Sequence, residues 1–166
     1  MAPHDTIETL YAAFARLDPQ GMSACYADDT TFDDEAFSLR GKREVMGMWT
    51  MLAENVKAQG GPSAWRLEWS SVKADGDRGR AHWEAWYRFS ATGRDVHNVI
   101  DAEFRFDPQG RIVTHRDRFP FWRWSRQALG TPGLLLGWSP MLRTKVRQRA
   151  AGNLARWLEK HPDGVV

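Results

Sequence analysis

The sequence changes its hydrophobic period near residue 65, and this change limits the folds that the chain can adopt. Before this point, apolar residues recur every three or four positions, whereas from Trp65 to Trp122 they recur at every second position. A period of two is typical of strands that bury one face. Three turn motifs interrupt this stretch, namely Asp75-Gly76-Asp77, Thr92-Gly93-Arg94 and Asp107-Pro108-Gln109-Gly110. The pattern therefore predicts four successive antiparallel strands, a β-meander.

The residues before the strands have helical periodicity. Apolar residues that follow the candidate N-terminal cap Asp5 predict an amphipathic first helix that ends at Asp18-Pro19; they are Ile7, Leu10, Tyr11, Phe14 and Leu17. A short helix around residues 20–26 and a longer one from Gly41 to about Val56 follow. Helices followed by consecutive strands are typical of an α+β domain. We therefore predict a cone-shaped roll in which the N-terminal helices pack on a curved antiparallel meander sheet.

A tail of about 45 residues follows the strands. Residues 122–129 have a helical pattern, Gly130-Thr131-Pro132-Gly133 predicts a break, and Pro140 suits the first turn of a last helix. That helix is apolar on one side and rich in arginine elsewhere. We therefore divide the chain into a domain at 1–122 and a helical C-terminal extension at 123–166. The extension is interpreted as a lid or dimer element, with a helix lying on a membrane surface as the alternative.

Composition limits the partners and the compartment. Lys and Arg total 23 against 21 for Asp and Glu, so the net charge gives no reason to expect nucleic acid. The basic residues of the last helix also lack interleaved aromatic residues or a known binding motif, and no nucleic-acid partner is expected. Cys25 is the sole cysteine, and neither a cysteine cluster nor a metal-binding histidine spacing occurs, so no metal and no cofactor are expected. Without a targeting segment or a run of about eighteen apolar residues, the expected location is cytoplasmic.

The hairpin turns predict which side chains face the interior, because opposed residues of antiparallel strands share a face. The predicted pairs across the last turn are Phe104 with Val113, Ala102 with His115, Ile100 with Asp117 and Asn98 with Phe119. Those across Thr92-Gly93 are Phe89 with Val96, Tyr87 with Asn98, Ala85 with Ile100 and Trp83 with Ala102. The two turns assign the same face of the middle strand to the interior. A slip of one residue would invert every side chain, so this agreement supports the assignment.

The predicted interior is apolar except for a few polar side chains. A buried carboxylate such as Asp117 needs a partner, a raised pKa or a wet cavity, and His115 lies two residues earlier on the same face. A histidine and a carboxylate among apolar walls suit general acid–base chemistry. The alternative is a structural hydrogen bond at the end of the sheet. Tyr87 and Asn98 would then be either buried hydrogen-bonding residues or groups that orient a substrate.

Two segments carry a resemblance to a known group of proteins. They are Tyr26-Ala27-Asp28-Asp29-Thr30-Thr31-Phe32-Asp33-Asp34 and Val99-Ile100-Asp101-Ala102-Glu103-Phe104-Arg105-Phe106-Asp107-Pro108-Gln109-Gly110-Arg111-Ile112. Over roughly residues 5–122 the chain resembles the nuclear transport factor 2-like superfamily, which includes ketosteroid isomerases, SnoaL-like (polyketide-cyclase-like) proteins and limonene epoxide hydrolases. The resemblance implies a conical pocket for an apolar small molecule and a homodimer.

The resemblance also assigns positions. Asp34 falls where the isomerases carry their proton-shuttling carboxylate, and Asp117 falls where epoxide hydrolases and cyclase-like members carry an acid. The isomerase tyrosine aligns with Leu10 and its companion acid with Ala102, so that oxyanion hole is disfavoured. The Arg-x-Asp pair of the epoxide hydrolases aligns with Trp83 and Ala85, which leaves that triad incomplete.

Three functions remain open from the sequence. The first is a cofactor-independent isomerase, cyclase or hydrolase in which Asp34, His115 and Asp117 are catalytic and Tyr87 and Asn98 position the substrate. Further substrate contacts are expected from aromatic side chains, namely Trp83, Phe104, Phe119, Phe32 and Trp49. The second is a non-catalytic binder of an apolar ligand, and the third is a protein-interaction module that uses the open face of the sheet.

Overall fold

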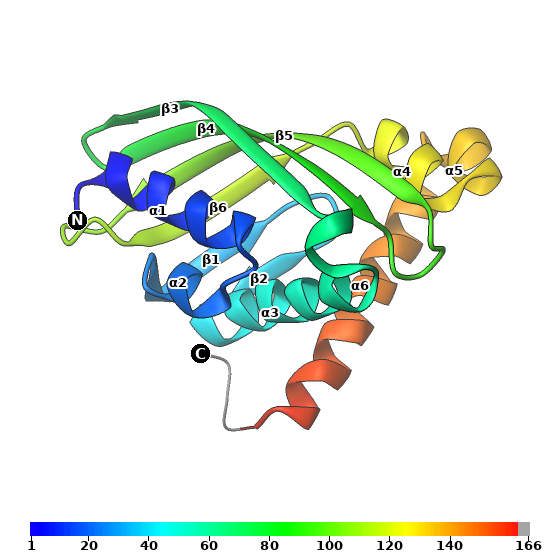
Figure 1. Cartoon of the computed structure of the whole chain (residues 1–166), viewed down its shortest axis with the longest axis horizontal. Coiled ribbons are helices and arrows are strands. Elements are labelled where there is room, and N and C mark those ends of the chain that lie inside the picture. The colour runs from blue at the N-terminus through cyan, green and yellow to red at the C-terminus, as the bar shows by residue number, and fades with distance from the viewer. Residues whose placement is uncertain (163–166) are drawn as a thin grey trace.

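The computed structural model describes residues 1–162, and within them six strands form one curved sheet (Figure 1). The strands are β1 (Tyr26–Asp33), β2 (Ser38–Arg40), β3 (Arg66–Asp75), β4 (Arg78–Arg88), β5 (Asp95–Phe106) and β6 (Ile112–Arg118). Their order across the sheet is β2-β1-β6-β5-β4-β3. The predicted meander is confirmed as β3 to β6. The sheet is mixed rather than wholly antiparallel, because β1 runs parallel to β6.

The β1–β2 hairpin is the part of the sheet that periodicity did not resolve. Strand β1 lies before the stretch of period two from which the strands were predicted, and β2 is three residues long. Pairing between the hairpin and β6 brings Phe32 opposite His115. The N-terminal half of the chain therefore contributes directly to the wall of the sheet where the predicted acid–base residues lie.

The predicted strand register is wrong by two residues in both hairpins. Trp83 lies opposite Ile100, Ala102 opposite Asp117 and Phe104 opposite His115. The β4–β5 loop is longer than a two-residue turn, and a bulge follows Arg105 in the β5–β6 pair. A shift of two keeps each side chain on its face, so the interior was assigned correctly despite the register.

Val113 is the exception to that assignment. The bulge places Ile112, rather than Val113, in the core. A bulge adds one residue to a strand and so reverses the alternation at that point. On the outer face, the predicted register would place Asp101 opposite Arg116 as an ion pair. Asp101 lies opposite Arg118 and contacts His82 instead.

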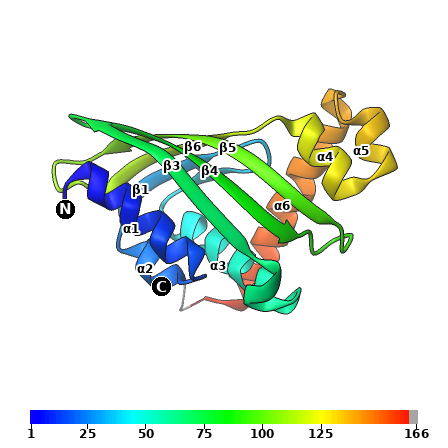
Figure 2. The same cartoon turned by 45° about the horizontal axis from the view of Figure 1, so that its top comes forward.

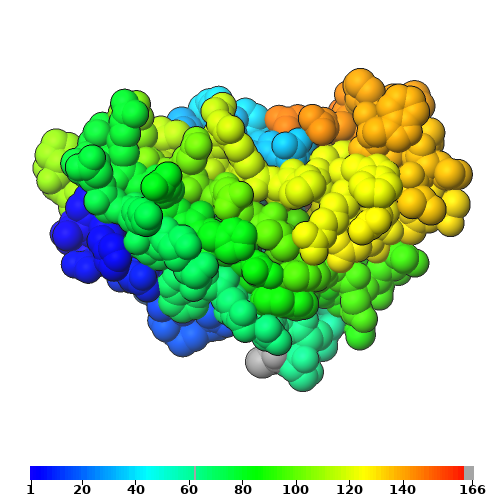
Figure 3. All heavy atoms as spheres, turned by 90° about the horizontal axis from the view of Figure 1, so that it is seen from above, coloured from blue at the N-terminus to red at the C-terminus, as the bar shows by residue number. Residues whose placement is uncertain are grey.

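Helices cover one face of the sheet, as predicted. They are α1 (Pro3–Ala15), α2 (Pro19–Ser23), α3 (Lys42–Ala58) and the short 3-10 helix η1 (Gly61–Ala64). Helix α1 begins before Asp5, which lies in its first turn and not at its cap. Figures 1 and 2 show α1 and α3 on the same side of the sheet, and Figure 3 shows the strands uncovered on the other side. The core lies between the two layers and contains Ile7, Phe14, Trp49 and Phe104.

The C-terminal residues form three helices, α4 (Phe121–Leu129), α5 (Thr131–Leu136) and α6 (Pro140–Lys160). The predicted break at Gly130-Thr131-Pro132-Gly133 is a sharp turn at Gly130, and Pro132 already lies in the first turn of α5. Helix α6 packs along α3, where Leu154 is buried in the main core. Residues 163–166 of the predicted extension lie outside the described part of the chain. Among residues 1–162, no helix is both long and apolar enough to cross a membrane.

Candidate active site

A cavity of about 320 Å³ lies between the sheet and helices α3, α4 and α6. Its wall is mainly apolar and aromatic, and includes Phe14, Trp49, Trp65, Trp83, Phe89, Phe119 and Trp124. Four polar side chains join this wall, namely Asp34, Tyr87, Asn98 and Asp117. More exposed polar residues also line it, among them Asn55, Arg88, Arg149 and Asn153. A space of this size and lining suits a small, largely apolar molecule held by a few polar groups.

The predicted site residues separate into two groups. Seven of them line the cavity: Asp34, Trp49, Trp83, Tyr87, Asn98, Asp117 and Phe119. His115, Phe32 and Phe104 are buried outside the lining, next to one another. The His115 ring centroid lies 5.0 Å from that of Phe32 and 4.5 Å from that of Phe104. His115 is therefore a neighbour of the cavity, and it contacts two of the lining residues, Asp117 and Trp49.

Asp117 belongs to a buried chain of hydrogen bonds. Its Oδ1 lies 3.0 Å from His115 Nε2 and accepts a hydrogen bond of 3.3 Å from Trp83 Nε1. On the other side of the imidazole, Nδ1 lies 2.8 Å from the hydroxyl of Tyr26. That hydroxyl accepts a 3.0 Å hydrogen bond from Trp49 Nε1. The chain thus runs from α3 through β1 and β6 to a carboxyl group at the cavity.

The N–H donors in this series of hydrogen bonds determine which atom donates and which accepts in each of them. An indole N–H can only donate, so the Tyr26 oxygen is an acceptor for Trp49 and its own proton is left for His115 Nδ1. A neutral imidazole that accepts at Nδ1 carries its proton on Nε2, which donates to Asp117. Two N–H donors then converge on one oxygen of Asp117, an arrangement that suits a carboxylate. We assign the histidine tautomer from these partners.

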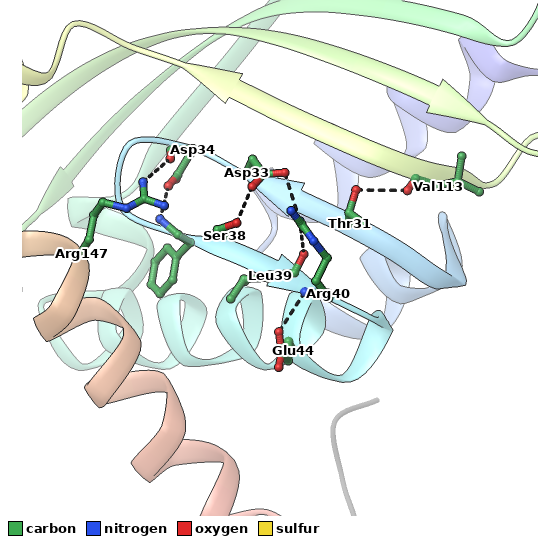
Figure 4. A network of polar contacts seen from close by, with 10 residues as sticks. Thr31, Asp33, Asp34, Ser38, Leu39, Arg40, Glu44, Val113 and Arg147 are labelled. Carbon is green, nitrogen blue, oxygen red and sulfur yellow. Dashed lines mark hydrogen bonds and ion pairs between the residues drawn. The ribbon is translucent and has the colours of Figure 1, made fainter. Parts of the chain in front are cut away.

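Asp34 lies at the turn between β1 and β2. Its Oδ1 accepts 2.6 Å hydrogen bonds from the backbone N–H groups of Ala36 and Phe37. The turn is held from outside by Arg147 of α6, whose Nη1 donates to the carbonyl oxygens of Asp34 and Glu35 at 3.0 and 3.1 Å (Figure 4). The geometry fixes one carboxyl oxygen of Asp34. Its other oxygen accepts no hydrogen bond from the described residues.

The two neighbouring aspartates of this turn have opposite surroundings. Asp33 points away from Asp34, toward Ser38 and Arg40, and forms an ion pair with Arg40 at 3.1 Å (Figure 4). Burial among the apolar cavity residues raises the pKa of Asp34 from 3.8 to about 7, against the two backbone hydrogen bonds, and the charge of Asp117 adds to the rise. Asp34 can therefore exchange a proton near neutral pH.

Tyr87 and Asn98 bring neutral polar groups to the same cavity. The Tyr87 oxygen accepts a 2.9 Å hydrogen bond from Trp124 Nε1 of α4, so its own proton is free to be donated. Burial raises the pKa of Tyr87 to about 12, which keeps the phenol protonated. The Asn98 side chain forms no hydrogen bond with the described part of the chain. Both side chains can therefore bind a polar group of a ligand.

Comparison with known proteins agrees with this architecture. The family description that matches is that of the SnoaL-like domain, over residues 7–115. The chain belongs to the SnoaL-like family. No curated protein sequence gives a significant match.

Solved structures share the fold of this SnoaL-like chain at low sequence identity. An epoxide hydrolase from M. tuberculosis that is similar to limonene epoxide hydrolase is 22% identical, with a TM-score of 0.58, and the match covers 81% of this chain and 92% of that one. A nuclear transport factor 2-like protein of unknown function from Burkholderia pseudomallei is 21% identical, with a TM-score of 0.61 and coverages of 77% and 98%. A Catenulispora acidiphila protein with a ketosteroid isomerase-like fold, solved with trimethylamine, is 14% identical, with a TM-score of 0.60 and coverages of 84% and 100%. These likenesses confirm the predicted fold and leave the reaction undetermined.

Sequence reasoning missed several residues of the site in this SnoaL-like domain. Tyr26 and Trp124 each supply a hydrogen-bond partner to a predicted residue, and Arg147 fixes the turn that holds Asp34. Tyr26 stands at the start of the segment that carries the family resemblance, and this was its only signal. Trp124 and Arg147 lie beyond the family match, where no pattern links them to the cavity. Among the described residues, no group of three or more His, Cys, Asp or Glu side chains is placed to hold a metal.

Proposed function

We propose that this SnoaL-like domain binds an apolar, carbonyl-bearing small molecule and moves a proton on it without a cofactor. The observation that carries the proposal is that Asp34, with its pKa near neutrality, shares one apolar cavity with Asp117. A base works best when its pKa lies near the working pH, and the surrounding apolar wall accounts for that value here. The reaction class is that of an isomerase or cyclase.

The proposed step starts with ionised Asp34. Its carboxylate removes a proton from a carbon next to the carbonyl, and the electron pair of the broken C–H bond moves into the carbonyl group to give an enolate. The Tyr87 hydroxyl donates a hydrogen bond to the enolate oxygen, and the Asn98 amide orients it. Where the substrate has a carbon–carbon double bond conjugated with the enolate, the electron pair extends to the far carbon of that double bond. Asp34 then returns the proton to this carbon, and the carbonyl group re-forms.

Asp117 and His115 have different parts in this proposal. Asp117 lines the cavity, and its charge favours the protonated form of Asp34 that follows the first proton transfer. His115 does not line the cavity, and we propose it as a positioning residue that fixes the Asp117 carboxylate through the Nε2 contact. The carbonyl of the substrate would then lie toward Tyr87 and away from Asp117, since two negative oxygens repel each other.

The test measures proton exchange on a simple ketone. β-Tetralone, an apolar bicyclic ketone with acidic C–H groups, is incubated with the protein in deuterium oxide, and loss of its α-proton signals is followed by NMR. We expect exchange that rises with pH through about 7, because Asp34 must be ionised. Asp34→Asn should lower the rate about a hundredfold or more. The amide oxygen can still accept the two backbone hydrogen bonds, so the turn is retained.

Asp33→Asn is the matched control, since Asp33 is the adjacent aspartate and points away from Asp34. It should change the rate by less than about twofold. Equal rates in the two variants and the wild type would contradict the catalytic proposal. If β-tetralone then still binds and is displaced from the cavity by apolar competitors, the protein is a non-catalytic binder.

A further inference from the structure

The C-terminal helices expose a cluster of large apolar side chains. Within residues 1–162, the exposed large hydrophobic side chains are Met1 and six others that all lie between residues 122 and 141. These six, which we call the α5 patch, are Trp122, Leu134, Leu135, Leu136, Trp138 and Met141. Leu135 is 62% exposed and Trp138 is 75% exposed. Figures 1 and 3 show α5 projecting at the edge of the molecule.

The α5 patch is not a frayed part of the core. Its neighbours Phe121, Trp124 and Ala128 are buried in a cluster with Val96, so α4 is docked on the sheet. Helix α5 in turn lies against α4 so closely that a Cβ on Gly133 would come within 1.9 Å of the Ser125 carbonyl oxygen. The apolar side chains are therefore presented to the outside by a firmly packed support.

The indole N–H groups of the two tryptophans in the patch already form hydrogen bonds within the protein. Trp122 Nε1 donates to the carbonyl oxygen of Leu134 at 3.2 Å, and Trp138 Nε1 donates to that of Leu135 at 2.9 Å. An indole that enters an apolar phase with an unpaired N–H is penalised, and here that penalty is absent. The leucine and methionine side chains carry no N–H or O–H group. The whole patch can thus leave water without losing a hydrogen bond.

The segment that carries the patch is basic, although two of its arginines, Arg118 and Arg143, form ion pairs with Glu103 and Glu35. No acidic residue occurs from Arg118 to Leu158, whereas this stretch holds eight basic ones: Arg118, Arg123, Arg126, Arg143, Lys145, Arg147, Arg149 and Arg156. Arg126 and Lys145 are exposed, and the Arg126 guanidinium lies 4.7 Å from the ring centroid of Trp122. A partner that covers the patch must therefore tolerate or carry negative charge.

We propose that the α5 patch docks on the surface of an anionic lipid bilayer. Protruding Trp, Leu and Met side chains need no complementary pocket in a bilayer, and basic residues beside them are attracted to anionic headgroups. A second copy of the chain fits less well, because a two-fold contact would bring the same basic residues together. The bilayer also supplies apolar molecules, and Trp124 and Leu129 of the same α4 helix line the cavity.

Vesicle flotation tests this docking independently of any ligand or reaction. The full chain is mixed with vesicles of phosphatidylcholine and phosphatidylserine in a ratio of roughly two to one, and with vesicles of phosphatidylcholine alone. We expect binding to the first, weaker binding to the second, and loss of binding as salt is added. The double variant Leu135→Ala with Trp138→Ala should lower the partition coefficient about tenfold or more, since both side chains are exposed and can be removed without disturbing the core.

A matched pair of charge variants separates the patch from the overall charge. Arg126→Glu with Lys145→Glu should lower binding about tenfold, whereas Lys73→Glu with Arg80→Glu, which are also exposed but lie on β3 and β4, should lower it less than about threefold. Equal losses in both pairs would overturn the proposal. It would also be overturned if the wild-type protein fails to float with the vesicles. If sedimentation then shows self-association that the Leu135 and Trp138 changes abolish, the patch binds a second copy of the chain instead.

Discussion

At the scale of single residues, the raised pKa of Asp34 couples stability to pH. Its carboxyl has an ordinary pKa of 3.8 when unfolded and about 7 when folded, because burial disfavours the charged form. The folded state therefore holds this proton more tightly. The resulting stabilisation is complete below about pH 4 and is lost as the pH rises through 7.

The Asp34→Asn variant cannot titrate, so the difference in unfolding free energy between wild type and variant isolates this effect. From pH 4 to pH 8 we expect the wild type to lose about 2 kcal/mol relative to the variant. The full linkage is about 4 kcal/mol, and the partial exposure of the carboxyl reduces it. Urea unfolding at a series of pH values measures the difference. A difference that is flat over this range would show that Asp34 is ionised at an ordinary pKa.

Two buried tyrosines provide a second comparison at this scale. The Tyr26 hydroxyl joins Trp49 to His115, whereas the Tyr11 hydroxyl has no hydrogen-bond partner in the described part of the chain. Tyr26→Phe should cost about 2–3 kcal/mol, because it leaves an indole N–H and an imidazole nitrogen unpaired. Tyr11→Phe should be neutral or stabilising, because it removes an unpaired buried group. Urea unfolding checks both, and a greater loss for Tyr11→Phe would contradict this account.

The limits of sequence reasoning at the site follow from the range of the interactions. Asp117 and His115 were predicted together because alternate residues of one strand share a face, which is a local rule. Asp34 was recognised from the family resemblance. Tyr26, Trp124 and Arg147 contact the site across long sequence separations, and nothing local marks them.

At the scale of the elements, replacing two helical glycines by alanine should have opposite effects on stability. A Cβ on Gly133 would meet the backbone of α4, whereas one on Gly152 of α6 would lie 3.6 Å from its nearest neighbour, the end of the Arg156 side chain. Gly133→Ala should cost about 1–3 kcal/mol, because α5 must move away from α4. Gly152→Ala should add about 0.5–1 kcal/mol, because alanine favours the helix.

Thermal unfolding with hydrogen exchange over residues 121–141 measures both effects. Increased exchange in α4 and α5 is expected for Gly133→Ala alone. A stabilised Gly133→Ala protein would show that the two helices are not in close contact.

The elements themselves were largely predictable, and the errors have local causes. The meander, its interior face and most helix bounds follow from periodicity and turn residues. The strand register does not follow from them. The turn residues show where a hairpin lies, but they do not show how many residues the loop contains, and the loop length sets the register. No sequence pattern marks the β5–β6 bulge, which places Ile112 rather than Val113 in the core. Strand β2 is too short for a period to be read.

At the scale of the whole molecule, the relation between the two predicted segments is the main question. The division into 1–122 and 123–166 was based on the end of the strand pattern. In the structure, α6 supplies Val146 and Ala150 to the cavity wall and Leu154 to the main core. We propose that the extension is part of the same cooperative unit and closes the cavity. The homodimer and the cytoplasmic location stay predictions.

The substitution Leu154→Ala tests whether α6 unfolds together with the rest of the domain. Leu154 is 3% exposed, and loss of a buried leucine costs about 2–4 kcal/mol. If α6 and the domain unfold together, the midpoint of urea unfolding should fall equally when followed by far-ultraviolet circular dichroism and by tryptophan fluorescence, because Trp49 and Trp83 report on the core and Trp157 reports on α6. Leu158→Ala, at a half-buried position one turn later, should give a smaller shift in the same direction. If α6 were instead an independent appendage, unfolding of Leu154→Ala would show two steps. Part of the helical signal and the fluorescence of Trp157 on α6 would change first, and the main transition would stay at the wild-type midpoint.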